Sequence, residues 1–562
     1  MTIVFVTFES EFAPLGGLAA VMRVLPKKIA CVEPGTCFTL VPFFREITKC
    51  HKQMFNQIHS TGTCLTIPFG KKKKKVEIFK HVDSQGFTTY LLDAPGFFTA
   101  PCDCCNPPSP SSPCNPYLNP SNPKQLLMDA LFLSKAVPYV LVQLGYTSNL
   151  ILHLQDWETA MVALTMKEMP ALESATCFLT LHNSYDAPIR KDEFCKISSR
   201  TLPGSTVLRK MIPLIDSPLL TVSQHFAREL TRDSLHTAVY APHLVRFIKR
   251  KGILGINNGS FGTSSLPPAA MKAARNEDFQ PLLKEKARYR QEMIHALESY
   301  RPAGAWGHLD FAGFDGPVFF FFGRDDPRQK GYDVAAAAIA RMPKGKAKYI
   351  FSPIPGDEGI QGLEFLKRLA HRRPGEVKVF PFRMQQGYSE LQKGSSFLVM
   401  CSFYEPFGGA TEGYAAGTPV VARATGGLVQ QVCPYSCRSL TLVVQHLVKP
   451  YHASLEHPSG ILFREPRLPA HDTIEGWRAI VACRYWPKED RVVQRLRIPL
   501  FRAIVRKAKQ ALLDAGALYS DDPMGYARMI SHGARMLESF SWESSVQQYH
   551  LLYTHVREKK SL

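Results

Sequence analysis

The chain has 562 residues, of which 45% are hydrophobic and 21% carry a charge, and its formal net charge at pH 7 is +20. A chain of this length is too long for one hydrophobic core, so at least two domains are expected. The balance of apolar and charged residues is typical of a soluble globular protein and excludes none of the common enzyme classes.

No segment of the sequence indicates secretion or membrane insertion. The first strand-like run, Ile3 to Phe8, lacks a basic flank and is followed directly by acidic residues, which argues against a signal peptide. The long apolar stretch from Leu126 to Leu144 is interrupted by Asp129, Lys135 and Pro138, so it is not expected to span a bilayer. We therefore expect a cytoplasmic protein without a membrane span.

The positive charge suggests nucleic acid as a partner, but its distribution argues against one. Five consecutive lysines, Lys71 to Lys75, lie between two strand-like runs, Cys64 to Pro68 and Val76 to Phe79, where a hairpin turn would place all five in solvent. No aromatic residues that could stack on bases are interleaved with them. No nucleic-acid partner is expected, although a positive field would attract a nucleotide sugar.

Four closely spaced cysteines invite a metal-site interpretation. Cys102, Cys104, Cys105 and Cys114 have thiolate spacings that could hold a metal, but no histidine is near and the run is rich in proline and serine. We favour a flexible surface insertion at about residues 101–116.

Taken in chain order, apolar strands alternate with amphipathic helices on both sides of a loosely patterned middle. This pattern predicts an α/β fold with two doubly wound sheets. In the first half the predicted strands are Ile3 to Phe8, Phe38 to Val41, Thr88 to Leu92, Leu150 to His153 and Ala175 to Leu181. In the second half they are Val318 to Phe322, Lys348 to Ser352, Val377 to Phe380, Phe397 to Met400 and Thr418 to Ala422. A boundary near Gly252 gives domains 1–251 and 252–562.

The segment from Ser402 to Gly427, SFYEPFGGATEGYAAGTPVVARATGG, is the most informative. Glu405 opens it, and Gly408 and Gly409 leave main-chain N–H groups unobstructed where a helix begins. Unpaired N–H donors at a helix start favour a diphosphate. An ordinary strand, loop and helix of an α/β domain remains the alternative for this segment taken alone.

This segment resembles the donor site of retaining glycosyltransferases with two Rossmann-like domains, the GT-B type, most closely the glycogen and starch synthases. Eight further segments resemble the family in the same order along the chain. They are residues 4–30, 39–47, 153–160, 180–186, 221–230, 252–259, 321–334 and 539–553. The resemblance implies two such domains facing a central cleft, with the last helices crossing back onto the first domain. It also implies a nucleoside diphosphate sugar as donor, and no metal or other cofactor.

The resemblance assigns roles to residues of the second domain. Arg324 and Lys330 match the cationic pair on the diphosphate, although they are six residues apart here and five in the family. Glu405 matches the glutamate on the transferred sugar, and these three are the predicted catalytic residues. The predicted donor-binding residues are Gly16, Gly17, Tyr388, Gly408, Gly409 and Thr411. Tyr388 would stack on the nucleobase, with core packing as the alternative, and the role of Glu412 is left open.

On the first domain, Asp156, His182 and Asn183 follow predicted strands and would line the cleft at the strands' carboxyl ends. The same domain also departs from the family. The family lysine two residues before the first glycine is replaced by Pro14, followed by Leu15, and its aspartate by Ala20. Glu158 stands where bacterial members have histidine. These changes suggest an altered donor sugar or acceptor.

We hypothesise a glycosyltransferase that moves a hexosyl unit, with glucose favoured, from a nucleoside diphosphate sugar to an acceptor hydroxyl with retention. A glucan end is the acceptor that the resemblance implies. A small molecule, such as a secondary metabolite, is the alternative that the altered loop suggests, because an apolar Leu15 would suit an apolar acceptor. A catalytically silent, sugar-binding relative is a third hypothesis, which Leu15 and Ala20 favour and which Arg324, Lys330 and Glu405 oppose.

Overall fold

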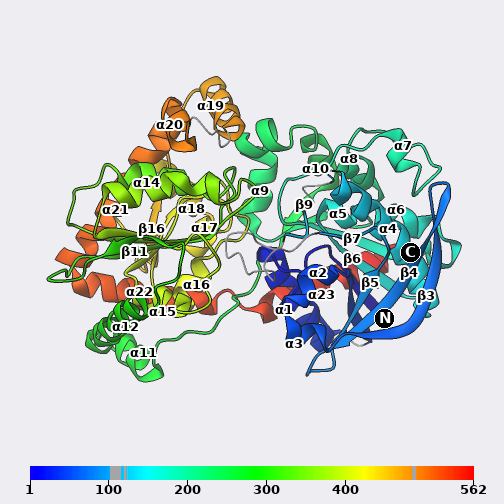
Figure 1. Cartoon of the computed structure of the whole chain (residues 1–562), viewed down its shortest axis with the longest axis horizontal. Helices are drawn as coiled ribbons and strands as arrows, with labels where there is room; N and C mark the ends of the chain where they lie inside the picture. The colour runs from blue at the N-terminus through cyan, green and yellow to red at the C-terminus, as the bar shows by residue number, and fades with distance from the viewer. Residues whose placement is uncertain (34, 101–114, 119–121, 123, 484–488, 562) are drawn as a thin grey trace. The chain divides into compact units, whose positions relative to one another are not determined.

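The computed structural model describes all residues except 34, 101–114, 119–121, 123, 484–488 and 562. It contains two compact units, both of the α/β class (Figure 1). The first unit consists of residues 1–259 and 542–562, and the second of residues 260–541. The predicted cysteine cluster, Cys102, Cys104, Cys105 and Cys114, lies outside the described residues.

The first unit is built on a nine-stranded sheet in the order β3-β4-β5-β2-β1-β6-β7-β8-β9. Its strands are β1 (Thr2–Val6), β2 (Thr36–Pro42), β3 (His59–Phe69), β4 (Lys72–Val82), β5 (Thr88–Asp93), β6 (Leu150–Gln155), β7 (Thr176–Leu181), β8 (Leu219–Thr221) and β9 (Ile253–Gly255). All pairings from β5 to β9 are parallel, whereas β3, β4 and β5 pair antiparallel. Every residue of β6 and β7 is buried, as expected for parallel strands covered on both faces.

Helices cover this sheet and include the C-terminal segment. They are α1 (Gly17–Val32), α2 (Arg45–Lys49), α3 (Lys52–Phe55), α4 (Gln125–Gln143), α5 (Asp156–Ala160), α6 (Val162–Lys167), α7 (Lys191–Phe194), α8 (Val207–Met211), α9 (Gln224–Arg232), α10 (Val245–Lys251) and α23 (Trp542–Ser561). The terminal helix α23 packs on α1, as the resemblance implied (Figure 1). The hydroxyl of Tyr553 lies 2.6 Å from Nδ1 of His153 on β6, which ties this helix to the sheet.

The second unit has a seven-stranded sheet in the order β10-β13-β12-β11-β14-β15-β16. Its strands are β10 (Trp306–Leu309), β11 (Val318–Arg324), β12 (Lys348–Ile354), β13 (Glu376–Val379), β14 (Phe397–Met400), β15 (Val420–Arg423) and β16 (Gly460–Phe463). Only β10 pairs antiparallel among these described strands. Apolar and aromatic side chains from β11, β12 and β14 form its core.

The helices of the second unit precede, alternate with and follow strands β10 to β16 in the chain, and they cover the sheet. They are α11 (Pro268–Arg275), α12 (Gln280–Ser299), α13 (Tyr332–Ile339), α14 (Glu364–Arg372), α15 (Tyr388–Gly394), α16 (Ala410–Ala415), α17 (Leu428–Gln431), α18 (Leu442–Val448), α19 (Ala470–Ala482), α20 (Arg491–Leu496), α21 (Pro499–Asp521) and α22 (Pro523–Glu538). In this unit α12 packs on α15, and α13 packs on α21.

Two details differ from the sequence prediction. The units divide after Gly259 rather than near Gly252, because β9 pairs with β8 and so extends the first sheet. The lysine run lies mostly within strand β4 and not in the turn, and Lys74 is half-buried with its ammonium 5.4 Å from the ring centre of Phe97.

Among the described helices, α4 is long and apolar enough to cross a membrane by length and composition alone. Most of it is buried within the protein.

Candidate functional site

The loop between β11 and α13 carries the predicted cationic pair. Arg324 is the last residue of β11, and Lys330 lies two residues before α13 begins. About a quarter of each side chain is exposed, so both cations can meet a ligand. The Arg324 guanidinium lies 3.9 Å from Asp326 and 3.8 Å from Asp357, which are long ion-pair distances. Gly331 ends the loop with a positive φ of 63°, and a Cβ there would collide with the carbonyl of Cys401.

Lys330 and Glu405 come together although they lie on different loops. The Lys330 ammonium donates to both carboxylate oxygens of Glu405, at 2.8 and 3.0 Å. The Ser402 hydroxyl donates to Oε2 of Glu405 at 2.9 Å, which fixes the carboxylate further. Glu405 is 6% exposed, so this is a partly desolvated ion pair in which each charge is held by the other. The structure thus juxtaposes two of the three predicted catalytic residues.

A buried arginine forms hydrogen bonds with the loop that carries Glu405. Arg423 at the end of β15 is fully buried, and its Nη1 donates to the carbonyl of Phe403 at 2.6 Å. Its Nε donates to Glu465 at 2.8 Å. The positive charges of Arg423 and Arg464 overcome the effect of burial and lower the pKa of the Glu465 carboxyl to about 2. Sequence reasoning missed Arg423, because an arginine at a strand end normally indicates a solvated position.

The glycine loop lies directly after Glu405 and leads into α16. Gly408 has a φ of 97° and passes so close to Leu428 that a Cβ would collide with it, and a Cβ on Gly409 would crowd Phe322. The positive φ makes glycine the favoured residue at Gly408, whereas at Gly409 a side chain would require the Phe322 ring to shift by a few tenths of an ångström. The hydroxyl of Thr411 is buried and has no hydrogen-bond partner among the described residues. A buried hydroxyl without a partner is costly, and because Thr411 is only 1% exposed, a ligand could bond to this hydroxyl only after the loop moves.

Tyr388 and Glu412 stand beside this loop in the second unit. Tyr388 begins α15 and is half-buried, with its ring in an edge-on contact with Phe320 at 5.7 Å. Part of the Tyr388 ring is therefore engaged in core packing. Glu412 lies in the first turn of α16, and its side chain is reached by solvent. Desolvation by the surrounding protein, together with the charge of Glu405, still raises the pKa of the Glu412 carboxyl, while Lys330 opposes the rise.

In the first unit, Gly16 and Gly17 precede and open α1. Both are exposed, and a Cβ on Gly17 would meet nothing within 4 Å, so the backbone is open to a close approach by a ligand. The carboxylate of Glu9 already accepts N–H groups of this loop, from Leu15 at 3.0 Å and from Gly16 at a shorter distance. Sequence reasoning missed this internal anion, which accepts the main-chain N–H of Gly16, one of the predicted donor-binding residues.

Asp156, His182 and Asn183 are brought together at the ends of β6 and β7. One oxygen of Asp156 accepts the His182 main-chain N–H at 2.7 Å, and the other accepts the Asn183 amide at 3.3 Å. Asp156 has a φ of 57°, a strained value for a residue other than glycine. Burial lowers the pKa of the His182 imidazole to about 3, so this ring is neutral near pH 7.

Three carboxylates crowd this part of the first unit. Burial raises the pKa values of Asp156 and Glu158, and the negative charges of neighbouring carboxylates, Glu9 among them, raise them further. The Tyr117 hydroxyl donates to Glu9 at 3.0 Å. Glu158, which stands at the family's histidine position, is buried and therefore keeps a proton more readily than an ordinary glutamate.

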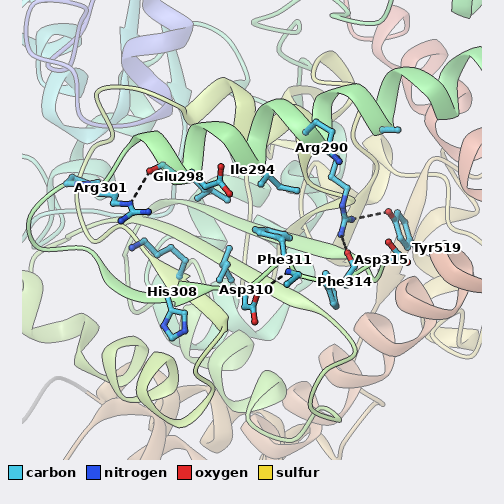
Figure 2. A pocket seen from close by; sticks show the side chains of 18 residues that line it. Arg290, Ile294, Glu298, Arg301, His308, Asp310, Phe311, Phe314, Asp315 and Tyr519 are labelled. Carbon is cyan, nitrogen blue, oxygen red and sulfur yellow. Dashed lines mark hydrogen bonds between the residues drawn. The ribbon is translucent and has the colours of Figure 1, made fainter.

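The predicted residues do not line the pocket shown in Figure 2. This pocket, of about 1180 Å³, lies in the second unit between α12 and the segment that contains β10. Arg290 borders it and donates to the Tyr519 hydroxyl at 3.1 Å and to the carbonyl of Gly316 at 2.9 Å. Phe311 and Phe314 supply apolar lining beside the Arg290 guanidinium. The lining residues do not include Arg324, Lys330 or Glu405.

Comparison with known proteins gives matches in both units. The family model of the starch synthase catalytic domain matches residues 2–241, and the model of glycosyl transferases group 1 matches residues 313–452. A glycogen synthase of Pseudothermotoga lettingae is 22% identical over 456 residues, which cover 77% of this chain and 85% of that protein. D-inositol 3-phosphate glycosyltransferase 2 of Catenulispora acidiphila is 32% identical over 205 residues, 33% of this chain and 46% of that protein.

A solved structure shares the architecture of the whole chain. The catalytic domain of starch synthase IV from Arabidopsis thaliana, solved with ADP and acarbose bound, covers 99% of both chains with a TM-score of 0.65 and 18% sequence identity. At this identity the likeness is one of fold. Together with the two family models, it shows that the chain is a glycosyltransferase similar to the glycogen and starch synthases, with two Rossmann-like domains of the GT-B type.

Proposed function

We propose that the chain transfers a hexosyl unit, with glucose favoured, from a nucleoside diphosphate sugar to an acceptor hydroxyl, with retention of anomeric configuration. The observation that carries this proposal is the ion pair of Lys330 and Glu405 beside the Gly408–Thr411 loop. It puts one cation and one carboxylate together where main-chain and hydroxyl donors are also available. A diphosphate and the sugar attached to it need these groups side by side.

In the proposed reaction the bond from the anomeric carbon to the diphosphate oxygen breaks, and a bond to the acceptor oxygen forms on the same face. The acceptor proton passes to the departing diphosphate, so atoms and charges balance. Negative charge grows on the diphosphate as it leaves, and Arg324 and Lys330 are placed to neutralise it. Glu405 would bind sugar hydroxyls and offset positive charge at the anomeric carbon.

The roles proposed for the other residues follow from their chemistry. Gly408, Gly409 and Thr411 would bind the distal phosphate, and Tyr388 would contact the nucleobase. Neutral His182 would hydrogen-bond a sugar hydroxyl, with Asp156 and Asn183 fixing its loop. Gly16 and Gly17 would allow the donor to approach the first domain, where the carboxylate of Glu9 already takes up the Gly16 N–H. A donor group approaching there would have to be compatible with that carboxylate.

A glucan end is the first candidate acceptor, because the similarity to glycogen synthases extends over most of the chain. A small-molecule acceptor is the second candidate. It is supported by the changes at Pro14 and Ala20 and by the partial similarity to a D-inositol 3-phosphate glycosyltransferase. Leu15 lends it little support, because this side chain is only 7% exposed and offers scant apolar surface to an acceptor.

The two acceptors are distinguished by restoring the family carboxylate with Ala20→Asp. Initial rates would be measured for wild type and variant with a maltooligosaccharide and with an apolar alcohol, in the presence of a nucleoside diphosphate glucose. A glucan synthase should gain activity on the oligosaccharide, because the new carboxylate can bind a sugar hydroxyl. Loss of transfer to the alcohol, without gain on the oligosaccharide, would favour a small-molecule acceptor. Ala19→Ser, at the neighbouring buried position, is the control for a polar substitution in the same helical turn.

A further inference from the structure

Helix α20 lies beyond both segments matched by the family models and places two arginines inside the second unit. Arg491 is 2% exposed and Arg495 is completely buried. They are four residues apart and so project from one face of the helix. Two buried guanidinium groups on a six-residue helix are costly unless their charges and donors are satisfied. The groups that these two arginines bind therefore indicate the structural role of α20.

Arg491 binds the start of the loop that carries the predicted cationic pair. Its Nη2 donates to both carboxylate oxygens of Asp325, at 2.9 and 3.1 Å. Its Nη1 donates to Glu358 at 3.1 Å. Asp325 directly follows Arg324 and is 1% exposed, so this ion pair is buried. The contact fixes the chain at the residue next to Arg324.

Arg495 binds the middle and the far side of the same loop. Its Nη2 donates to the carbonyl of Pro327 at 2.7 Å, and its Nη1 donates to Asp333 in the first turn of α13. Further bonds join it to the carbonyl of Ile480 in α19. The loop from Asp325 to Gln329 is one residue longer than the family spacing implies. Arg495 binds a main-chain carbonyl within this longer loop.

The same contacts extend to the loop of Glu405. The carbonyl of Gln329 accepts the Phe403 N–H at 2.7 Å, and the Arg495 guanidinium lies 5.3 Å from the centre of the Phe403 ring. Phe403 is two residues before Glu405. A shift of the Arg495 side chain would thus disturb both loops that form the Lys330–Glu405 pair.

We propose that α20 is a brace for the donor loop, and that Arg491 and Arg495 are positioning residues that hold Arg324 and Lys330 in place. The proposal rests on the proposed function and adds a determinant of donor binding from a segment that the family models do not cover. The brace acts on the loop itself, through the carboxylates of Asp325 and Asp333 and the carbonyl of Pro327, because neither arginine is exposed enough to touch a donor.

The test uses Arg491→Met combined with Asp325→Asn, which removes both charges of the buried pair; Glu358, whose side chain is 12% exposed, loses its bond from Arg491. A matched control is Arg373→Met with Glu376→Gln. This pair is also buried in the second unit, with Nε of Arg373 2.6 Å from Glu376 and its other nitrogens on the carbonyls of Ile339, Met342 and Pro343. It has no hydrogen bond to residues 325–331 among the described contacts.

The first readout is hydrogen exchange of the full-length protein, which needs no ligand. The N–H groups of Gln329 and Lys330 both donate to the carbonyl of Asp326 at 2.9 Å, so the intact loop protects them. We expect at least about tenfold faster exchange of these amides in the Arg491→Met/Asp325→Asn variant and less than about threefold change in the control. Exchange at the wild-type rate, or an equal increase in the control, would overturn the brace.

The second readout separates positioning from a general loss of stability. Steady-state turnover of a nucleoside diphosphate glucose should show kcat/KM at least about tenfold lower in the brace variant, and within about threefold of wild type in the control at a similar thermal unfolding midpoint. Arg495→Lys should recover part of the activity lost in Arg495→Met, because the ammonium can still pair with Asp333. Equal losses in brace and control variants would contradict the proposal. Absence of turnover in wild type would refute the proposed function, while the exchange experiment would still decide the brace.

Discussion

Lys330 and Glu405 lie 75 positions apart in the sequence, yet the ammonium of one is 2.8 and 3.0 Å from the two carboxylate oxygens of the other. The pair joins the β11–α13 loop to the loop that follows β14. Each residue belongs to a segment that resembles the donor site of glycogen and starch synthases. The ion pair therefore links these two loops of the proposed donor site, together with the main-chain bond from the Phe403 N–H to the Gln329 carbonyl.

Removing either partner should reduce turnover strongly. We expect Lys330→Met and Glu405→Gln each to lower kcat/KM about a hundred- to a thousandfold, as when one preorganised electrostatic contact is lost. The double variant should lose much less than the sum of the two effects, because the residues act as a unit. Steady-state kinetics on wild type, the two single variants and the double variant form a double-mutant cycle, which measures this coupling.

The control for this cycle is the pair of Lys27 and Asp83, which has the same chemistry, a 2.8 Å separation and similar exposure in the first unit. Lys27→Met with Asp83→Asn should leave kcat/KM within about threefold of wild type. Additive losses in the Lys330 and Glu405 cycle, or an equal loss in the control pair, would show that the ion pair has no specific catalytic role.

Transfer should continue in the presence of excess EDTA. Arg324 and Lys330 supply fixed positive charge at the proposed diphosphate position, which in other transferases is the contribution of a divalent ion. Rates would be compared with and without chelator after dialysis. Inactivation with rescue by manganese or magnesium would refute this assignment of roles, whereas rescue by zinc alone would point to the cysteines at 102, 104, 105 and 114.

The stability of the first unit should decrease as pH rises from about 4 to about 7 through the titration of Asp129. Burial raises the pKa of this carboxyl to about 7, and hydrogen bonds from Gln125 and the Phe98 main chain oppose the rise only in part. The folded protein thus binds a proton that the unfolded chain releases, and the free energy of unfolding falls by up to about 1.4 kcal/mol per pH unit in this window.

The check compares the free energy of unfolding at pH 5, 6 and 7 for wild type and Asp129→Asn. Unfolding is monitored by hydrogen exchange of the amides in α4. The variant should show a smaller decline with pH, because its amide does not titrate. Asp192→Asn, at an exposed position, should keep the wild-type slope. Identical slopes for wild type and Asp129→Asn would mean that the carboxyl is already ionised at pH 5.

Much of the fold could be predicted because its strands are short, apolar and bounded by turn residues. All ten strands predicted for the two sheets are present, including β6 and β7 of the first and β11 and β14 of the second. The very short strands β8 and β9 were not predicted, since three residues give no periodicity. The units therefore divide several residues later than predicted, because β9 belongs to the first sheet.

Residues of the proposed site could be named from the sequence where a local motif contains them, and not where side chains from distant segments contribute. Glu405 and Gly408 belong to one short segment, so the resemblance could place them. Glu9, Arg423 and Arg491 could not be recognised, because each looks like a surface charge until the fold provides its buried partner. Leu15, which we interpreted as apolar surface for the acceptor, is almost fully buried, because sequence alone does not show which way a loop side chain points.

The most direct test of the proposed transfer is donor turnover, since slow hydrolysis of the donor requires no knowledge of the acceptor. Purified wild type and Arg324→Ala would be incubated with a panel of nucleoside diphosphate sugars, and release of the nucleoside diphosphate followed over time. We predict release from at least one glucose donor by wild type, and a rate about a hundred- to a thousandfold lower for a folded Arg324→Ala variant. No release by wild type from any donor, or release by Arg324→Ala within about threefold of wild type, would contradict the account.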